Sequence, residues 1–99
     1  MARKASKALE AFINEAIRQC ARVRYYPTTF QGMRDRHGTL EAIERLVLSG
    51  ELQSGFKRLK AENLLEWSVE AAVIKFSSEF APSARECAEF RVRLVKELG

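Results

Sequence analysis

The side chains that could carry out metal, acid–base or nucleophilic chemistry are few in this sequence and stand apart. His37 is the only histidine, and no spacing of Cys, His or carboxylate residues suggests further ligands beside it. In the last turn of a predicted helix, its imidazole would interact favourably with the helix dipole. The serines fall at predicted turns and helix starts, without the G-x-S-x-G spacing of a nucleophile elbow. Neither a metal site nor a catalytic serine is predicted.

The remaining reactive residue types also favour a structural interpretation. Cys20 and Cys87 lie in apolar, helical surroundings, which predicts two buried thiols in a reducing cytoplasm. The five glycines never form a phosphate-cradling loop. Glu41 and Glu44 form a carboxylate pair of the kind that a solvated helix face carries. We therefore predict that the protein is not an enzyme and binds no cofactor.

The elements that must position these residues have helical periodicity. The 99 residues suit one domain. Ser6 is a suitable N-cap for a first helix over residues 7–24, which must end before the proline that follows Tyr26. One arc of this helix carries its apolar residues, Leu9, Phe12, Ile13, Ala16, Ile17, Cys20 and Val23.

The stretch "YYPTTFQGMRDRHG", residues 25–38, begins a second helix. Two starts fit it: a capping box over residues 28–31, or Pro27 at the first helical position, where its missing N–H costs nothing. Phe30, Met33 and His37 then share one face, and Gly38 stops the helix.

Four more helices follow by the same logic. Thr39 is expected to cap a helix over residues 40–48, which is followed by Gly50. Ser54 or Gly55 opens a short helix, with Phe56 and Leu59 facing inward and a left-handed cap at Asn63. Ser68 opens the fifth helix, with Glu70 in its first turn, where the helix dipole explains an acidic residue. A capping box over residues 83–86 begins the last helix, whose expected apolar stripe is Cys87, Phe90, Leu94 and Leu98. The prediction is all-α: a single compact domain of about six short helices over residues 1–99, with a flexible N-terminus at residues 1–6.

The order of several of these residues resembles a small, uncharacterised bacterial family of helical proteins. Its pattern is Tyr-x-Pro-Thr-x-Phe, Met, His-Gly, Gly-Phe-x-x-Leu and then Leu-x-x-Ser/Thr-Val-Glu-x-x-Val. The matching residues are Tyr25, Pro27, Thr28, Phe30, Met33, His37, Gly38, Gly55, Phe56, Leu59, Leu65, Ser68, Val69, Glu70 and Val73. The resemblance covers residues 25–80 and implies a helical module that stands alone or is appended to larger bacterial proteins. It implies no activity. Tyr26 departs from the pattern, because the family more often has a small polar capping residue there.

Positive charge is concentrated in the first third of the chain. Residues 1–38 hold eight Lys or Arg and three acidic residues, a net charge of +5, whereas residues 39–99 have a net charge of −1. Such asymmetry hints at an anionic partner for the first third. The candidate anion or nucleic-acid surface is Lys7, Arg18, Arg22, Arg24, Arg34 and Arg36, and Lys57, Arg58 and Lys60 form a second basic group. A solvated, solubilising surface explains the same residues.

Three aromatic residues near helix junctions are candidates for a partner surface: Tyr25, Tyr26 and Trp67. Closing a small core is the alternative role for each of them. No apolar run approaches the ~18 residues of a membrane span, and the start of the sequence lacks the uninterrupted apolar segment of a secretory signal. We therefore expect a non-enzymatic cytoplasmic module that mediates protein–protein interaction. The alternative is a nucleic-acid-binding accessory protein that uses the first helix and the Tyr-Pro junction on DNA or RNA. The sequence identifies neither the partner nor the oligomeric state.

Overall fold

The computed structural model describes residues 4–48 and 54–98, with residues 54–56 and 96–98 described by their backbone alone. The elements in chain order are α1 (Lys7–Arg22), α2 (Thr28–His37), α3 (Thr39–Leu48), α4 (Ser54–Ala61), the 3-10 helix η1 (Leu65–Trp67), α5 (Val69–Lys75), the 3-10 helix η2 (Ser77–Glu79) and α6 (Pro82–Leu98). The described residues contain no strand. The prediction of a single all-α domain of about six helices is confirmed.

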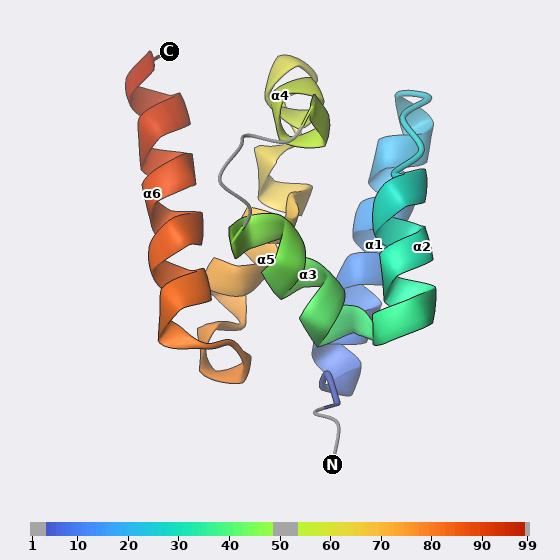
Figure 1. The fold of residues 1–99 in the computed structure, drawn as a ribbon. Helices are drawn as coiled ribbons and strands as arrows, with labels where there is room; N and C mark the ends of the chain where they lie inside the picture. The colour runs from blue at the N-terminus through green and yellow to red at the C-terminus, as the bar shows by residue number, and fades with distance from the viewer. Residues whose placement is uncertain (1–3, 49–53, 99) are drawn as a thin grey trace.

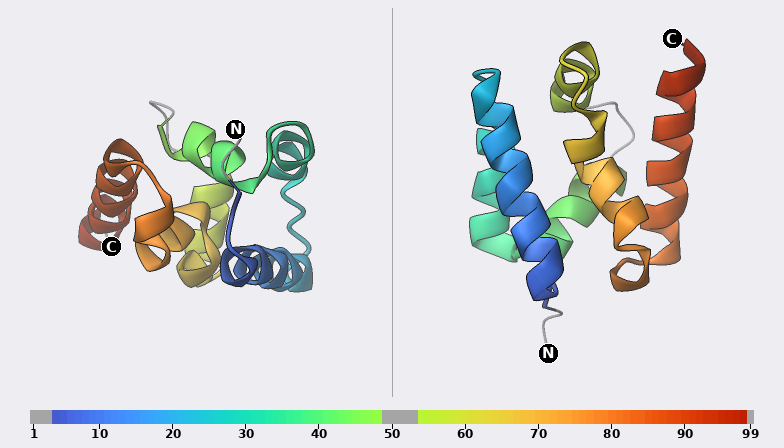
Figure 2. Two further views of the ribbon diagram at one scale, coloured as in Figure 1. Left: turned by 90° about the horizontal axis from the view of Figure 1, so that it is seen from below. Right: turned by 180° about the vertical axis from the view of Figure 1, so that it is seen from behind.

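The helices form one layer around a small central core. Helices α1 and α2 lie on one side, α6 lies on the opposite side, and α3 and α5 fill the space between them (Figure 1). Seen from behind, α5 and η1 separate α1 from α6 (Figure 2). The buried core residues come from five of the helices: Leu9 and Ile13 of α1, Phe30 of α2, Ile43 and Val47 of α3, Val73 of α5, and Ala84 and Ala88 of α6. None of the described helices has the length and apolar character needed to cross a membrane.

Helix α1 begins as predicted and ends two residues early. The Ser6 hydroxyl accepts a hydrogen bond from the Leu9 amide at 3.1 Å, so Ser6 is the N-cap. At the other end Arg24 is left-handed, with φ 59°. The Arg24 amide donates to the Ala21 carbonyl and the Tyr25 amide to the Cys20 carbonyl, both at 2.9 Å. This pair of bonds is a Schellman motif, which usually has glycine where this chain has Arg24.

Both predicted starts of α2 are wrong by one residue. The helix begins at Thr28, Pro27 is the N-cap, and no side chain makes a capping hydrogen bond. Pro27 has φ −77° and ψ 68°, and the Thr28 amide donates to the Tyr26 carbonyl at 2.8 Å. This geometry is an inverse γ-turn, which provides a partner for one of the amides that a helix start leaves unsatisfied.

The remainder of α2 is closer to the prediction. Phe30 is buried, Met33 is half-buried against the core, and His37 is exposed. Gly38 has φ 86° and ends the helix, as predicted. Thr39 is not a helix cap, because it lies inside α3 and its hydroxyl bonds Glu10 and Arg34 instead.

Two local predictions in the second half of the chain are confirmed. Asn63 is left-handed, with φ 60°, and it closes α4 through a Schellman motif in which the Leu64 amide donates to the Leu59 carbonyl at 2.8 Å. The Ser68 hydroxyl accepts from the Ala71 amide at 3.0 Å, so Ser68 is the N-cap of α5. Leu59 is buried as expected. The predictions for Gly50 and for the side chains of Phe56 and Leu98 fall outside the described residues.

Helix α6 differs from the prediction in its start and in its buried face. It begins at Pro82, and the Ala81 carbonyl accepts the first helical bonds, so Ser83 is not the cap. Proline tolerates this first position because its missing N–H would be unpaired there anyway. The buried residues are Ala84, Ala88, Arg91 and Val95, whereas Phe90 is 59% exposed. The buried face of α6 therefore lies one residue away from the predicted stripe, a rotation of about 100° about the helix axis. The small alanines let α6 approach its neighbours closely, and Arg91 has a buried ion partner.

Candidate functional site

A cavity of about 270 Å³ opens beside the junction between α1 and α2. We call it the aromatic pocket. It is lined by Ile13, Ala16, Ile17, Cys20, Tyr25, Tyr26, Pro27, Thr28, Thr29, Phe30, Leu46, Leu59, Trp67, Ser68, Val69 and Glu70. These residues come from α1, from the α1–α2 turn with the start of α2, from the end of α3, from α4, and from the stretch between Trp67 of η1 and Glu70 of α5. Segments far apart in the sequence thus build one concave, mainly apolar site.

The three aromatic residues that the sequence nominated as a partner surface all line this pocket. Tyr26 is 61% exposed, whereas Tyr25 and Trp67 are half-buried. The Trp67 ring packs against the Phe12 ring with a centroid distance of 5.1 Å, so part of it belongs to the core. Trp67 therefore packs against Phe12 and also lines the pocket.

The backbone turns described above explain why the aromatic side chains converge. The Schellman motif at Arg24 reverses the chain after α1 and brings Tyr25 back beside Cys20. The γ-turn at Pro27 then directs the chain into α2, which places Tyr26 at the rim and Phe30 in the wall. On the far side, the Ser68 cap fixes the turn that carries Trp67.

Arg58 of α4 lies against the outer side of the pocket. Its guanidinium carbon is 6.0 Å from the centroid of the Tyr25 ring, within reach of a cation–π contact. Its Nη2 donates to the Val23 carbonyl at 2.9 Å, and its Nε lies 3.3 Å from a carboxylate oxygen of Glu62. Arg58 thereby holds α4 against the end of α1.

Glu70, at the floor of the pocket, belongs to a buried ion pair that sequence analysis missed. Glu70 is 1% exposed, and its Oε2 accepts a hydrogen bond from Nη1 of Arg91 at 3.0 Å. The same Arg91 nitrogen donates to the Leu46 carbonyl at 3.1 Å. Burial raises the pKa of Glu70, although a backbone hydrogen bond at Glu70 itself and the hydrogen bond and charge of Arg91 act in the opposite direction. The first-turn position that the sequence explained by the helix dipole is therefore also the position of a buried ion pair.

A sequence signal for this pair does exist. Arg91 falls in the series Ala84, Ala88 and Val95, which shares one face of α6, and Glu70 precedes Val73 by three residues on α5. A charged residue on an otherwise small or apolar helix face indicates a buried partner. Each residue viewed alone, however, fits an exposed helix surface.

The two cysteines differ in burial. Cys20 is buried and lines the pocket, and burial raises the pKa of its thiol. Cys87 is only half-buried, so the prediction of two buried thiols is wrong for this residue. Both are free thiols. Tyr25 lies beside Cys20, and its pKa is raised, chiefly by burial.

The six basic residues nominated as an anion surface do not form one patch. Lys7 begins α1 and Arg24 follows its end, so the 16-residue helix, about 24 Å long, separates them. Arg18 pairs with Glu15, and Arg22 lies within 3.5 Å of Gln19. Arg36, like Lys7 and Arg24, is exposed.

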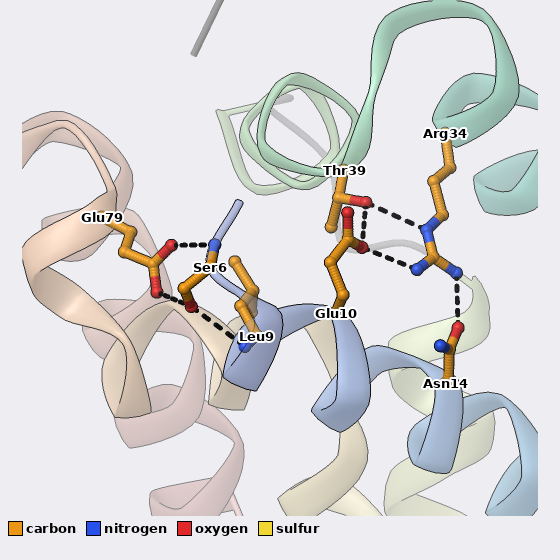
Figure 3. Close-up of polar contacts among 7 residues, drawn as sticks. All are labelled: Ser6, Leu9, Glu10, Asn14, Arg34, Thr39 and Glu79. Atoms are coloured by element: carbon orange, nitrogen blue, oxygen red, sulfur yellow. Dashed lines mark hydrogen bonds and ion pairs between the residues drawn. The ribbon is translucent and has the colours of Figure 1, made fainter. Parts of the chain in front are cut away.

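Arg34 is an internal cross-link rather than a surface cation. Its guanidinium donates to Asn14 at 3.0 Å, to Glu10 at 2.7 Å and to Thr39 at 3.0 Å (Figure 3). These bonds join α1, α2 and α3, so its charge is neutralised inside the fold. Burial alone would raise the pKa of Glu10, but the hydrogen bonds from Thr39 and Arg34 lower it overall.

His37 lies apart from the pocket, with its Nδ1 3.6 Å from a carboxylate oxygen of Glu41. Across the described ranges, no three Cys, His, Asp or Glu side chains gather as metal ligands. Comparison of the chain with protein-family models, with curated proteins and with solved structures finds no match.

Proposed function

We propose that this protein is a non-enzymatic interaction module that receives an apolar side chain of a protein partner in the aromatic pocket. The observation that carries the proposal is the convergence of Tyr25, Tyr26 and Trp67 on one cavity. Tyrosine and tryptophan are enriched among the residues that contribute most to protein–protein binding. A ring such as Tyr26, 61% exposed at the rim of a cavity, offers apolar area that a partner can cover.

The size of the pocket supports a side chain rather than a cofactor as its occupant. Ligand sites for drug-sized molecules usually measure about 300–1,000 Å³, and the aromatic pocket has about 270 Å³. Its walls are mainly apolar, and the carboxylate of Glu70 is already paired with Arg91. An aromatic or large aliphatic side chain matches both its volume and its chemistry.

A peptide library tests this proposal. Random peptides displayed on phage are selected on the immobilised protein, and enriched peptides are then synthesised and titrated against Tyr26→Ala and Phe90→Ala. Phe90, on α6, is a matched control because it is 59% exposed and does not line the pocket. We expect peptides with a shared apolar anchor whose affinity falls about tenfold or more in Tyr26→Ala and stays unchanged in Phe90→Ala.

Two outcomes would overturn the proposal. One is a selection without any enriched apolar anchor. The other is a set of peptides that bind Tyr26→Ala as tightly as the unaltered protein. Unfolding of both variants in denaturant shows whether they keep the fold.

Nucleic-acid binding, the alternative expected from the sequence, loses support from the pairing of Arg34 and Arg18 and from the spread of the other basic residues. Anisotropy of a labelled DNA duplex at about 50 and 200 mM salt provides the check. Micromolar affinity with a log–log salt slope of about −3 or steeper would favour the nucleic-acid function. We expect at most weak binding that follows the net charge.

A further inference from the structure

The charge at the mouth of the aromatic pocket defines the partner more closely than the pocket walls do. Arg24 and Tyr25 are consecutive, and Arg58 lies over the Tyr25 ring. One guanidinium group, that of Arg58, therefore lies beside a pocket residue. Both arginines are exposed.

Arg58 keeps hydrogen-bonding capacity for a ligand. A guanidinium has five N–H donors in a fixed fork. The contacts with the Val23 carbonyl and with Glu62 engage Nη2 and Nε, which leaves Nη1 without a partner in the described part of the chain. The contact with Val23 and the Tyr25 ring together hold the side chain in place, so less conformational entropy is lost when it binds.

We propose that the partner segment carries an Asp or Glu within one or two residues of its aromatic anchor, and that Arg58 binds this carboxylate. The inference rests on the proposed function, since it assigns a neighbour to the side chain that enters the pocket. The separation fits a short peptide spacing: Arg58 lies 6.0 Å from the ring that forms the pocket wall, and successive Cα atoms are about 3.8 Å apart. The exposed, positively charged Arg58 complements an acidic segment.

Glu62 determines how strongly Arg58 prefers a partner carboxylate. Its carboxylate lies 3.3 Å from Nε of Arg58 and partly neutralises the guanidinium. A partner carboxylate must therefore share the N–H donors of the Arg58 guanidinium with Glu62. Removing the Glu62 charge should strengthen the preference for an acidic segment, whereas removing the Arg58 charge should abolish it.

Three blocked tripeptides that share one anchor test the inference: acetyl-Asp-Trp-Asp-amide, acetyl-Asn-Trp-Asn-amide and acetyl-Lys-Trp-Lys-amide. Each is titrated into the ¹⁵N-labelled full chain at low salt, and amide shifts of pocket residues such as Tyr25 and Ser68 report binding. We expect the Asp peptide to bind about threefold to tenfold more tightly than the Asn peptide, and the Lys peptide to bind most weakly.

Variants assign this preference to its residue. In Arg58→Gln the ratio of Asp-peptide to Asn-peptide affinity should fall to about one. In Glu62→Gln the ratio should rise. Arg85→Gln removes the same charge from the first turns of α6, away from the pocket, and should leave the ratio as it is. Because the ratio compares two peptides on the same variant, a uniform loss of pocket affinity in Arg58→Gln does not change it.

The outcomes separate the inference from the proposed function. Equal binding of all three peptides overturns the inference and leaves the pocket as a side-chain receptor. Tightest binding of the Lys peptide also overturns it and shows that Glu62 selects cations instead. Failure of every peptide to bind overturns the proposed function itself, and the inference with it.

Discussion

Glu70 and Arg91 form an ion pair inside the protein, with 3.0 Å between Oε2 and Nη1 and side-chain exposures of 1% and 8%. The pair joins α5 to α6, and Arg91 extends it to α3 through the Leu46 carbonyl. It also forms part of the floor of the aromatic pocket. One polar contact thus connects the core, three helices and the candidate binding site.

Removing one partner of this pair should be strongly destabilising. We expect Arg91→Leu to lower the free energy of unfolding by about 3–5 kcal/mol, because it leaves the Glu70 carboxylate buried without its cation. Replacing both residues by leucine should recover much of this loss. Denaturant unfolding of the single and double variants measures both effects. A loss below about 1 kcal/mol in Arg91→Leu would show that water reaches Glu70 readily.

The left-handed conformation of Arg24 should make glycine stabilising at this position. A non-glycine residue pays about 1–2 kcal/mol for that conformation, and part of this cost is offset by the greater freedom of glycine in the unfolded chain. We expect Arg24→Gly to raise the free energy of unfolding by about 0.5–1 kcal/mol. The control is Arg22→Gly, two residues earlier at the last position of α1, which should lower it by up to about 1 kcal/mol. A destabilised Arg24→Gly protein would mean that the arginine side chain contributes more than its backbone costs.

The lowered pKa of Glu10 gives a pH dependence with a defined sign. Because the folded-state pKa lies below the ordinary value of 4.5, the ionised carboxylate stabilises the fold above that value. This contribution is lost as the pH falls through the lowered folded-state pKa. Glu10→Gln should therefore be less stable than the unaltered protein at pH 7, and the two stabilities should converge in acid. The difference at pH 7 should be modest, about 0.5–1 kcal/mol, since the Glu10 side chain is 41% exposed.

The two thiols should react at different rates with a thiol reagent. Cys20 is buried and its thiol has a raised pKa, so less thiolate is present and less of it is accessible. Cys87 is half-buried and should be modified first. Intact mass over time in Cys20→Ser and Cys87→Ser separates the two rates. Faster labelling of Cys20 would mean that the pocket opens widely in solution.

Features that depend on a few neighbouring residues could be predicted from the sequence. Ser6 and Ser68 cap their helices, Gly38 stops α2 and Asn63 closes α4, because each side chain or backbone conformation acts within one helical turn. The positions of three aromatic residues at helix junctions also indicated a partner surface: Tyr25, Tyr26 and Trp67. The cavity that these residues line could not be predicted, since its walls come from five segments.

Features that depend on distant partners could not be predicted. Arg34 looks like one more surface cation until the fold places Glu10, 24 positions earlier, against it. Phe90 looks like a core residue until the ion pair and the alanines of α6 take the buried face. The helix start at Thr28 was missed because the γ-turn at Pro27 replaces side-chain capping, so no capping residue marks the start in the sequence. The resemblance to a bacterial family stays a prediction.

The polar ties between distant segments divide the molecule into two ends of different character. Glu79 holds the start of α1 through the Ser6 amide and hydroxyl at 2.8 and 2.6 Å, and Arg34 and Thr39 hold Glu10 nearby (Figure 3). The aromatic pocket lies toward the other end of α1, where its walls are mainly apolar. The clasped end therefore fixes the direction in which α1 leaves η2 and α3, and with it the position of the pocket residues that α1 carries.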